Sequence, residues 1–336
     1  MEKVHRGRHS VIRRCAVTLV TVLGLLIVLL LLDSGLRQFS TSSLACGATL
    51  RTDQGAVVSC GAHSSETVTI YVPGVVAGSP EAGPLTDTWL RFGDVQFIDY
   101  EGDRFEPEPL AQEFGRILEA DLAAYDRVNI YAESMGCYLT LDALRGIKSS
   151  MTPKNRGKIQ LVLGDCPSGA ESITPFSAVV TFFYPGPIYN KLADGVFGLA
   201  HAAGIGGCPF AGKWSWSATC TPASQMSPSL DAASVQRKQV EASSGFPLSV
   251  FADQVRYLRQ GIPDVGGVSG IETTYLMNQP AHDSLVTQPL AANAWKSTFQ
   301  KAGISLTVTE LDFLTDHCDY SAWPQEWNAL FVSIFF

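Results

Sequence analysis

Short runs of β-branched and apolar residues alternate along this chain with segments whose apolar residues recur at helical spacing. Strands are predicted over 67–72, where Pro73-Gly74 ends the run, and over 95–100, 128–132 and 159–163. Helices are predicted over 109–125 and 135–144. Alternating strands and helices predict an α/β fold, with a mostly parallel sheet and helices on both of its faces.

This alternation stops after residue 165 and resumes near residue 273. The stretch of about 166–264 is rich in Pro, Gly and aromatic residues, with helical patches near 234–242 and 248–260. We interpret it as a cap insertion over one edge of the sheet. The alternation then resumes with strands over 273–277 and 304–309 and helices over 285–302 and 321–336.

The N-terminal region has a different pattern. Residues 15–32 carry no charge and follow a basic segment, 1–14, that contains Arg13-Arg14. Eighteen helical residues span about 27 Å, close to the hydrocarbon thickness of a bilayer. We therefore predict a transmembrane anchor at 15–32 with the rest of the chain extracytoplasmic. A cleaved signal followed by secretion is the alternative.

Residues 33–66 have little periodicity and are interpreted as a stalk and lead-in segment, so the α/β domain is predicted to cover 67–336. The apolar share of 46% is enough for a large core and excludes a disordered chain. The net charge is −8 although the first fourteen residues are basic, so the body of the chain is acidic. An acidic body argues against nucleic acid as a partner.

Seven of the eight cysteines follow the predicted anchor, in a compartment that permits disulfides. Cys46 with Cys60 and Cys208 with Cys220 are candidate pairs, because each pair encloses a turn-rich stretch. Cys137, Cys166 and Cys318 remain, and at least one of these three is expected to be a buried thiol.

Ser134 is the candidate nucleophile. It lies in Ala132-Glu133-Ser134-Met135-Gly136, where the strand predicted over 128–132 gives way abruptly to a helix. A sharp strand-to-helix turn exposes a serine hydroxyl and requires small flanking residues. The alternative is a serine that only caps the helix N-terminus.

A serine hydroxyl needs a base, and the base needs an orienting carboxylate. Among the histidines after the anchor, His317 follows the last predicted strand and precedes the closing helix, which fits the chain order serine, acid, histidine. Asp283, between a strand and a helix, is the favoured acid, although it could instead cap that helix. Asp165, after the strand at 159–163, is the alternative acid. Backbone N–H groups of Met135 and Val75 are the candidate oxyanion donors.

The chain resembles the α/β-hydrolase superfamily, nearest its lipase, esterase and monoacylglycerol-lipase-like branch. The resemblance is carried, in chain order, by Tyr71-Val72-Pro73-Gly74, Ala132-Glu133-Ser134-Met135-Gly136, Asp283 and His317. The resemblance covers residue 67 to the C-terminus and implies a core of about eight strands, a cap and a Ser-Asp-His triad with neither cofactor nor metal. Two residues depart from the family pattern. Pro73 stands where the family often has histidine, and Ala132 replaces the first glycine of the nucleophile elbow, the strand-to-helix turn that carries the serine.

The sequence therefore predicts a serine hydrolase that cleaves carboxylic esters or thioesters of small-molecule or lipid substrates. Two alternatives remain open, because a fold does not fix a function. One is an exterior serine peptidase or aminopeptidase of the same fold, and the other is a non-catalytic envelope binding protein that keeps the fold. The oligomeric state has no signal in the sequence.

Overall fold

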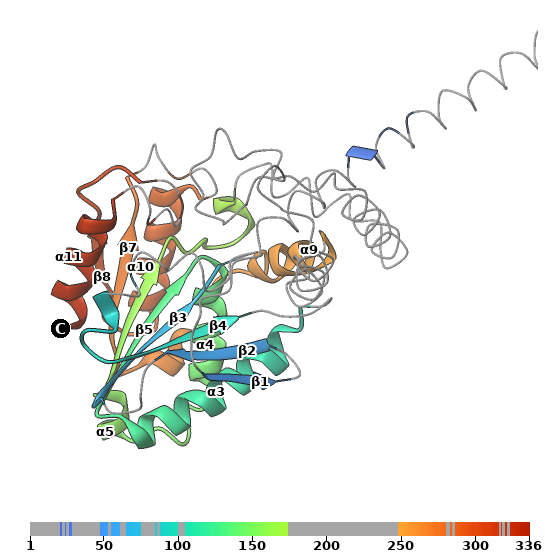
Figure 1. Cartoon of the computed structure of the whole chain (residues 1–336). Coiled ribbons are helices and arrows are strands. Elements are labelled where there is room, and N and C mark those ends of the chain that lie inside the picture. Colours follow the sequence, from blue (N-terminus) through green and yellow to red (C-terminus); the bar gives the residue numbers. More distant parts are fainter. Residues whose placement is uncertain are drawn as a thin grey trace, which may run out of the picture.

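A sheet of eight strands runs through the protein in the order β1-β2-β4-β3-β5-β6-β7-β8 (Figure 1). The strands are β1 (Ala48–Thr52), β2 (Gly55–Cys60), β3 (Thr67–Val72), β4 (Asp94–Asp99), β5 (Arg127–Glu133), β6 (Ile159–Gly164), β7 (Glu272–Met277) and β8 (Thr307–Glu310). The neighbouring pairs from β4 to β8 are parallel, whereas β1 and β2 join the sheet antiparallel. The carboxyl ends of six strands therefore meet at one edge.

The computed structural model describes residues 48–52, 55–60, 65–74, 88–99, 105–173, 248–279, 286–315 and 323–336, and residues 21, 24, 27, 28, 85, 283, 317 and 320. The helices described from end to end are α3 (Pro107–Ala124), α4 (Met135–Gly146), α5 (Pro153–Arg156), α9 (Leu248–Leu258), α10 (Gln288–Lys301) and α11 (Pro324–Phe335), with short 3-10 turns η1 (Ala170–Ser172) and η3 (Val265–Val268).

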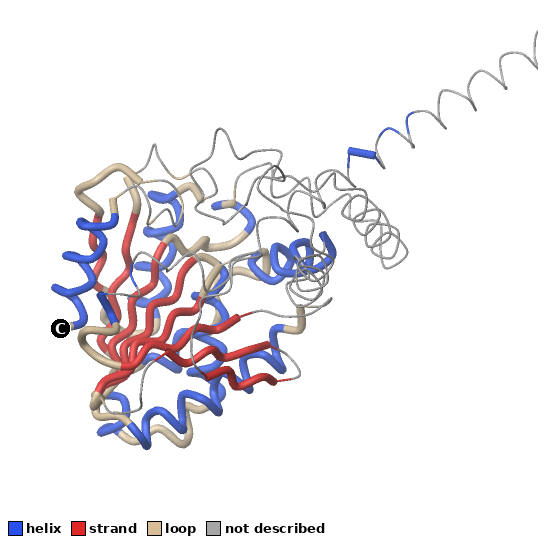
Figure 2. The backbone as a smooth tube through the Cα atoms, viewed as in Figure 1, coloured by secondary structure: helices blue, strands red, loops and turns tan. Residues whose placement is uncertain are grey.

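Helices cover both faces of the sheet, as Figure 2 shows. Successive residues of a strand point to opposite faces, and the buried side chains divide accordingly. Val128 and Ile130 of β5 pack in a core with α3, α4 and α10, while Tyr131, the residue after Ile130, packs in a second core with Trp327 and Phe331 of α11. The near-continuous apolar runs of the central strands are thus explained by burial on both faces.

The predicted α/β class and parallel sheet are confirmed. Each strand and helix expected between 67 and 163 is present, and so are those expected after residue 272. The sheet begins earlier than expected, because the segment 33–66, interpreted as stalk and lead-in, contains β1 and β2. These strands pair at the edge of the sheet, and β1 carries polar residues at Thr49, Arg51 and Thr52 that mask the strand pattern.

Two predicted regions fall mainly outside the described residues. Of the cap insertion at about 166–264, the structure describes 166–173 and 248–264, where α9 confirms the second helical patch. Of the anchor at 15–32, four helical positions are described, and within the described residues no helix is long and apolar enough to cross a membrane. The anchor stays a prediction.

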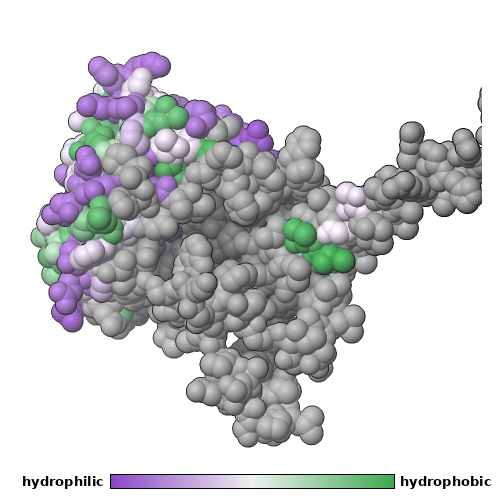
Figure 3. Space-filling model, turned by 90° about the horizontal axis from the view of Figure 1, so that it is seen from above, coloured by the Kyte–Doolittle hydropathy of each residue, from purple (hydrophilic) through white to green (hydrophobic). Residues whose placement is uncertain are grey.

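Large hydrophobic side chains are exposed at several described positions, among them Leu90, Leu290, Leu314 and Trp323. Figure 3 views the molecule from the end where the parallel strands finish and shows hydrophobic side chains in separate patches among hydrophilic ones. Scattered exposed apolar residues are ordinary for a protein surface. These exposed side chains therefore mark no particular site.

Candidate active site

Ser134 occupies a sharp turn between β5 and α4. Its backbone has φ 49° and ψ −117°, a conformation that L-residues rarely adopt. Ser134 stands at the N-cap position of α4, but its side chain makes no capping hydrogen bond. The capping role considered from the sequence is therefore not supported, and the hydroxyl is left for other chemistry.

Gly136 explains why the turn can be so tight. A Cβ at this position would lie 2.2 Å from the carbonyl oxygen of Val72 and 2.7 Å from that of Pro73. These are backbone atoms, so they cannot move aside as a flexible side chain could. The first turn of α4 therefore packs directly against the end of β3, and only glycine fits there.

Gly74, at the end of the Pro73-Gly74 turn, lies against the candidate nucleophile. A Cβ on Gly74 would lie 2.8 Å from the Cβ of Ser134 and 3.3 Å from its Oγ. The loop after β3 thus begins beside the serine, as an oxyanion loop requires. Met135 is the first residue of α4, where backbone N–H groups lack acceptors within the helix. Val75, the other predicted donor, lies outside the described residues.

His317 and Asp283 come together from the loops after β8 and β7. The Nδ1 atom of His317 lies 3.1 Å from Oδ1 and 3.2 Å from Oδ2 of Asp283. The carboxylate also accepts the N–H of Val286 at 2.8 Å, whereas the N-cap of α10 is Thr287. Asp283 is therefore bonded to the predicted base and is not the helix cap.

The charges of this pair reinforce each other. Burial by itself lowers the pKa of His317, but the negative charge of Asp283 and the hydrogen bond between them outweigh burial and raise it. Burial likewise raises the pKa of Asp283, yet the imidazolium charge and the hydrogen bonds outweigh it and hold that pKa below its usual value. The pair thus stabilises a protonated imidazole beside an ionised carboxylate.

Asp165, the alternative acid, lies in the same cluster. It follows β6 with a positive φ of 51° and is buried. Its carboxylate accepts hydrogen bonds from Asn278 Nδ2 at 2.9 Å and Gln288 Nε2 at 3.0 Å. Gln288 also donates to Asp283 Oδ2, so one side-chain amide bridges both candidate acids.

One carboxylate oxygen each from Asp165 and Asp283 and one imidazole nitrogen of His317 all lie within 4.8 Å of one another. Among the described residues this is the group that could hold a metal ion. Hydrogen bonds from Asn278, Gln288 and His317 already account for the carboxylate oxygens, so the arrangement fits a hydrogen-bonded network better than a metal centre.

Three residues of this site were missed from the sequence, namely Asn278, Gln288 and Tyr320. Asn278 directly follows β7 and Tyr320 lies three residues after His317. The position of Asn278 at a strand end, and of Tyr320 close to His317 in the sequence, was a usable signal. Gln288 is the first residue of α10 and had no such signal, because its partners are distant in the sequence.

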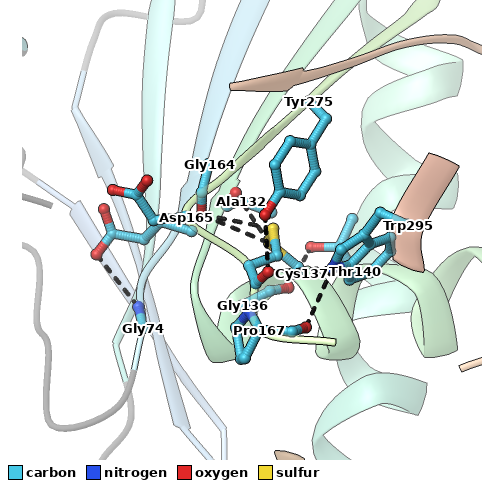
Figure 4. The surroundings of a disulfide bond; sticks show 12 residues. Gly74, Ala132, Gly136, Cys137, Thr140, Gly164, Asp165, Pro167, Tyr275 and Trp295 are labelled. Carbon is cyan, nitrogen blue, oxygen red and sulfur yellow. Dashed lines mark hydrogen bonds between the residues drawn. A yellow bond between two sulfur atoms is a disulfide. The ribbon is translucent and has the colours of Figure 1, made fainter. Parts of the chain in front are cut away.

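A disulfide joins Cys137, in the first turn of α4, to Cys166, directly after Asp165 (Figure 4). The carbonyl of Cys166 accepts hydrogen bonds from Tyr275 Oη at 2.8 Å and Trp295 Nε1 at 3.1 Å. The cross-link thus ties the helix after Ser134 to the loop that carries the second carboxylate. The predicted pairs Cys46–Cys60 and Cys208–Cys220 lie outside the described side chains, as does Cys318.

No protein-family model matches the chain, and no curated protein matches its sequence. Solved structures do match its fold. The type II thioesterase BorB from the borrelidin biosynthetic cluster has a TM-score of 0.53 and 14% identity, with 85% of this chain and 100% of that chain covered. A lipase-esterase related protein from Clostridium acetobutylicum has a TM-score of 0.50 and 8% identity, with 84% and 99% covered. At such identities the likeness is one of fold.

Proposed function

We propose that this chain, which has the α/β-hydrolase fold, is a serine hydrolase that cleaves carboxylic esters or thioesters. The observation that carries the proposal is the hydrogen bond between Nδ1 of His317 and the carboxylate of Asp283, 3.1 Å long, at the sheet edge where Ser134 holds its strained turn. The monoacylglycerol-lipase-like branch suggested by the sequence stays a prediction.

In the proposed mechanism the neutral form of His317 takes the proton of Ser134 as Oγ attacks the acyl carbon. Asp283 holds the ring through Nδ1, which leaves Nε2 for the serine, and stabilises the imidazolium that forms. The N–H groups of Met135 and Val75 would stabilise the oxyanion. Imidazolium then protonates the departing alcohol or thiol, and water, activated by the same imidazole, releases the acid from the acyl-enzyme.

We favour Asp283 over Asp165 as the orienting acid. The carboxylate of Asp283 is hydrogen-bonded to Nδ1 of His317, whereas that of Asp165 is held by two side-chain amides. The charge of Asp165 nevertheless raises the pKa of His317, after the larger contribution of Asp283. Asp165 is therefore proposed as an electrostatic neighbour of the triad.

An ester or thioester substrate is favoured over an aminopeptidase substrate. An aminopeptidase would need a carboxylate to bind the substrate amine, and Glu133, directly before Ser134, is a candidate. In the fold this side chain is buried and accepts hydrogen bonds from the Gly74 N–H and the Tyr320 hydroxyl, so it is already engaged. The proteins of similar fold named above include a thioesterase and a lipase-esterase related protein, which agrees with this choice.

A fluorophosphonate probe tests whether the chain is an enzyme at all. We expect the purified protein to be labelled and Ser134→Ala not to be labelled. Ser150→Ala, which changes an exposed serine at the end of the loop after α4, is the matched control and should keep full labelling. Absent labelling, or equal labelling of Ser134→Ala, would favour the non-catalytic binding protein.

A substrate panel then separates the two enzyme classes. We expect turnover of p-nitrophenyl esters and acyl thioesters, and at most slow turnover of aminoacyl p-nitroanilides. Turnover of amides alone would replace the proposal with a peptidase.

A further inference from the structure

Glu133, the residue directly before the candidate nucleophile, has no role in the mechanism above. Its side chain ends in a carboxylate, and the residue is 1% exposed. Placing a carboxylate in a protein interior is costly unless hydrogen bonds compensate for the lost water. Burial accordingly raises the pKa of Glu133, and its hydrogen bonds and the neighbouring His317 oppose that rise. Such a group calls for an explanation.

Two hydrogen bonds of Glu133 reach other loops of the site, and the side chain of Tyr71 in β3 also lowers its pKa against the effect of burial. Its Oε1 accepts the backbone N–H of Gly74 at 3.3 Å, at the start of the loop after β3. Its Oε2 accepts the hydroxyl of Tyr320, which lies three residues after His317 in the loop following β8. One carboxylate on the elbow therefore links the loops on either side of Ser134.

Tyr320 is itself fixed by its surroundings. Its hydroxyl lies 2.8 Å from that of Tyr131, and its ring packs edge-on against Tyr131 and Trp327. A Cβ at Gly164 would lie 2.5 Å from the Tyr131 hydroxyl, so β6 carries glycine where that ring passes. The contact from Glu133 therefore ends on a rigid aromatic group of the second core and not on a mobile side chain.

We infer that Glu133 is a positioning residue of this site, whose carboxylate holds the Gly74 loop and, through Tyr320, the His317 loop in register with Ser134. The inference rests on the proposed hydrolase function and adds to it. Gly74 packs against Ser134, so a shift of that loop would move the predicted oxyanion donor Val75 away from the serine. A shift of Tyr320 would likewise move the imidazole.

The charge of Glu133 gives this role a second readout. The titratable groups that act on His317 are Asp283, Asp165 and Glu133, and each raises its pKa against the effect of burial. Activity requires neutral His317 and so rises through the pKa of that ring as pH increases. Removing the charge of Glu133 should lower the pKa of His317, so the acidic limb of the pH profile of kcat/KM should move to lower pH.

The test compares Glu133→Gln, Tyr320→Phe and the double variant, with Glu272→Gln at the exposed first position of β7 as the control. We expect each single variant to lose about 10–100-fold in kcat with KM within about twofold, because misplacing reacting groups by an ångström costs about that much. The double variant should lose less than the product of the two losses, since both changes break one link. Only variants lacking Glu133 should move the acidic limb, and the control should match wild type.

The inference is overturned if folded Glu133→Gln keeps the kcat of the wild type and the acidic limb of its pH profile. If Ser134→Ala abolishes labelling at the same time, the proposed function is left intact. Loss of the proposed function would instead appear as labelling that is independent of Ser134. If Glu133→Gln does not fold, Tyr320→Phe decides. An unchanged kcat in that variant overturns the inference, and a reduced kcat at unchanged KM and melting temperature supports it.

Discussion

Ser134 combines a strained backbone with a side chain that takes no part in capping its helix. A non-glycine residue in such a conformation costs about 1–3 kcal/mol, and glycine adopts positive φ without that cost. Strain of this kind persists where surrounding structure imposes it, and here Gly136 and Gly74 pack closely on both sides of the turn. The strain therefore accompanies a site built around the hydroxyl.

We accordingly predict that Ser134→Gly is more stable than Ser134→Ala by about 1 kcal/mol, although both are inactive. Both variants lack the hydroxyl, and only alanine keeps the strained Cβ, while the greater freedom of unfolded glycine offsets part of the gain. Urea unfolding of the two variants measures the difference. Equal stabilities, or a less stable glycine variant, would mean that the turn stores no strain.

The two carboxylates near His317 should differ sharply in mutants. Asp283→Asn should lower kcat by about 10³–10⁴-fold, because the amide no longer stabilises an imidazolium or fixes its tautomer. Asp165→Asn should cost at most about tenfold, since it removes one charge at the edge of the cluster. Steady-state kinetics on one ester substrate compares them. A dead Asp165→Asn beside an active Asp283→Asn would move the acid to the end of β6.

At the scale of elements, apolar periodicity was enough to predict the central strands and their helices. β3 and β5 are buried on both faces and contain the runs that make strands recognisable, and chain order then placed Ser134, Asp283 and His317 at one sheet edge. Edge strand β1 lacks such a run. The bridge from Gln288 to both carboxylates depends on how α10 packs beside β6, which no local pattern encodes.

The disulfide was also missed for a physical reason. Cysteines that enclose turns are the pairs recognisable from the sequence, whereas Cys137 and Cys166 are 29 residues apart and meet only because β5 and β6 are neighbours. Both residues are completely buried and bonded to each other. The expected buried thiol could then be only Cys318 of the three remaining cysteines, and Cys318 lies outside the described residues.

Replacing Cys137 and Cys166 together by alanine should lower the free energy of unfolding by about 2–4 kcal/mol, because the cross-link restricts the unfolded chain over a loop of this length. Urea unfolding under oxidising conditions measures the loss. Reductant present throughout unfolding should destabilise wild type similarly and leave the double variant unchanged. Identical stability of wild type with and without reductant would show that the bond does not form.

For the molecule as a whole, the two faces of the sheet have separate tasks. On one face of the sheet, α3 and α10 pack in the same core as α4, the helix that follows Ser134. On the other face, α11 packs against Tyr131, whose hydroxyl contacts that of Tyr320. The carboxyl edge between them collects the candidate catalytic residues. This division could be predicted as an architecture, but the contacts that set the site's geometry arise only when the layers are assembled.

The predicted anchor would hold this domain at a membrane. An uncharged run at 15–32 after a basic segment predicts that the full chain stays in the membrane fraction after alkaline carbonate extraction. Deletion of residues 1–32 should make the chain soluble and retain the proposed esterase activity. Leu26→Arg should weaken insertion, because a charge at the centre of a spanning helix costs about 2.5–3.5 kcal/mol. Ser42→Arg, outside the run, is the matched control. A mature N-terminus located after residue 32 would instead identify the run as a cleaved signal and the protein as secreted.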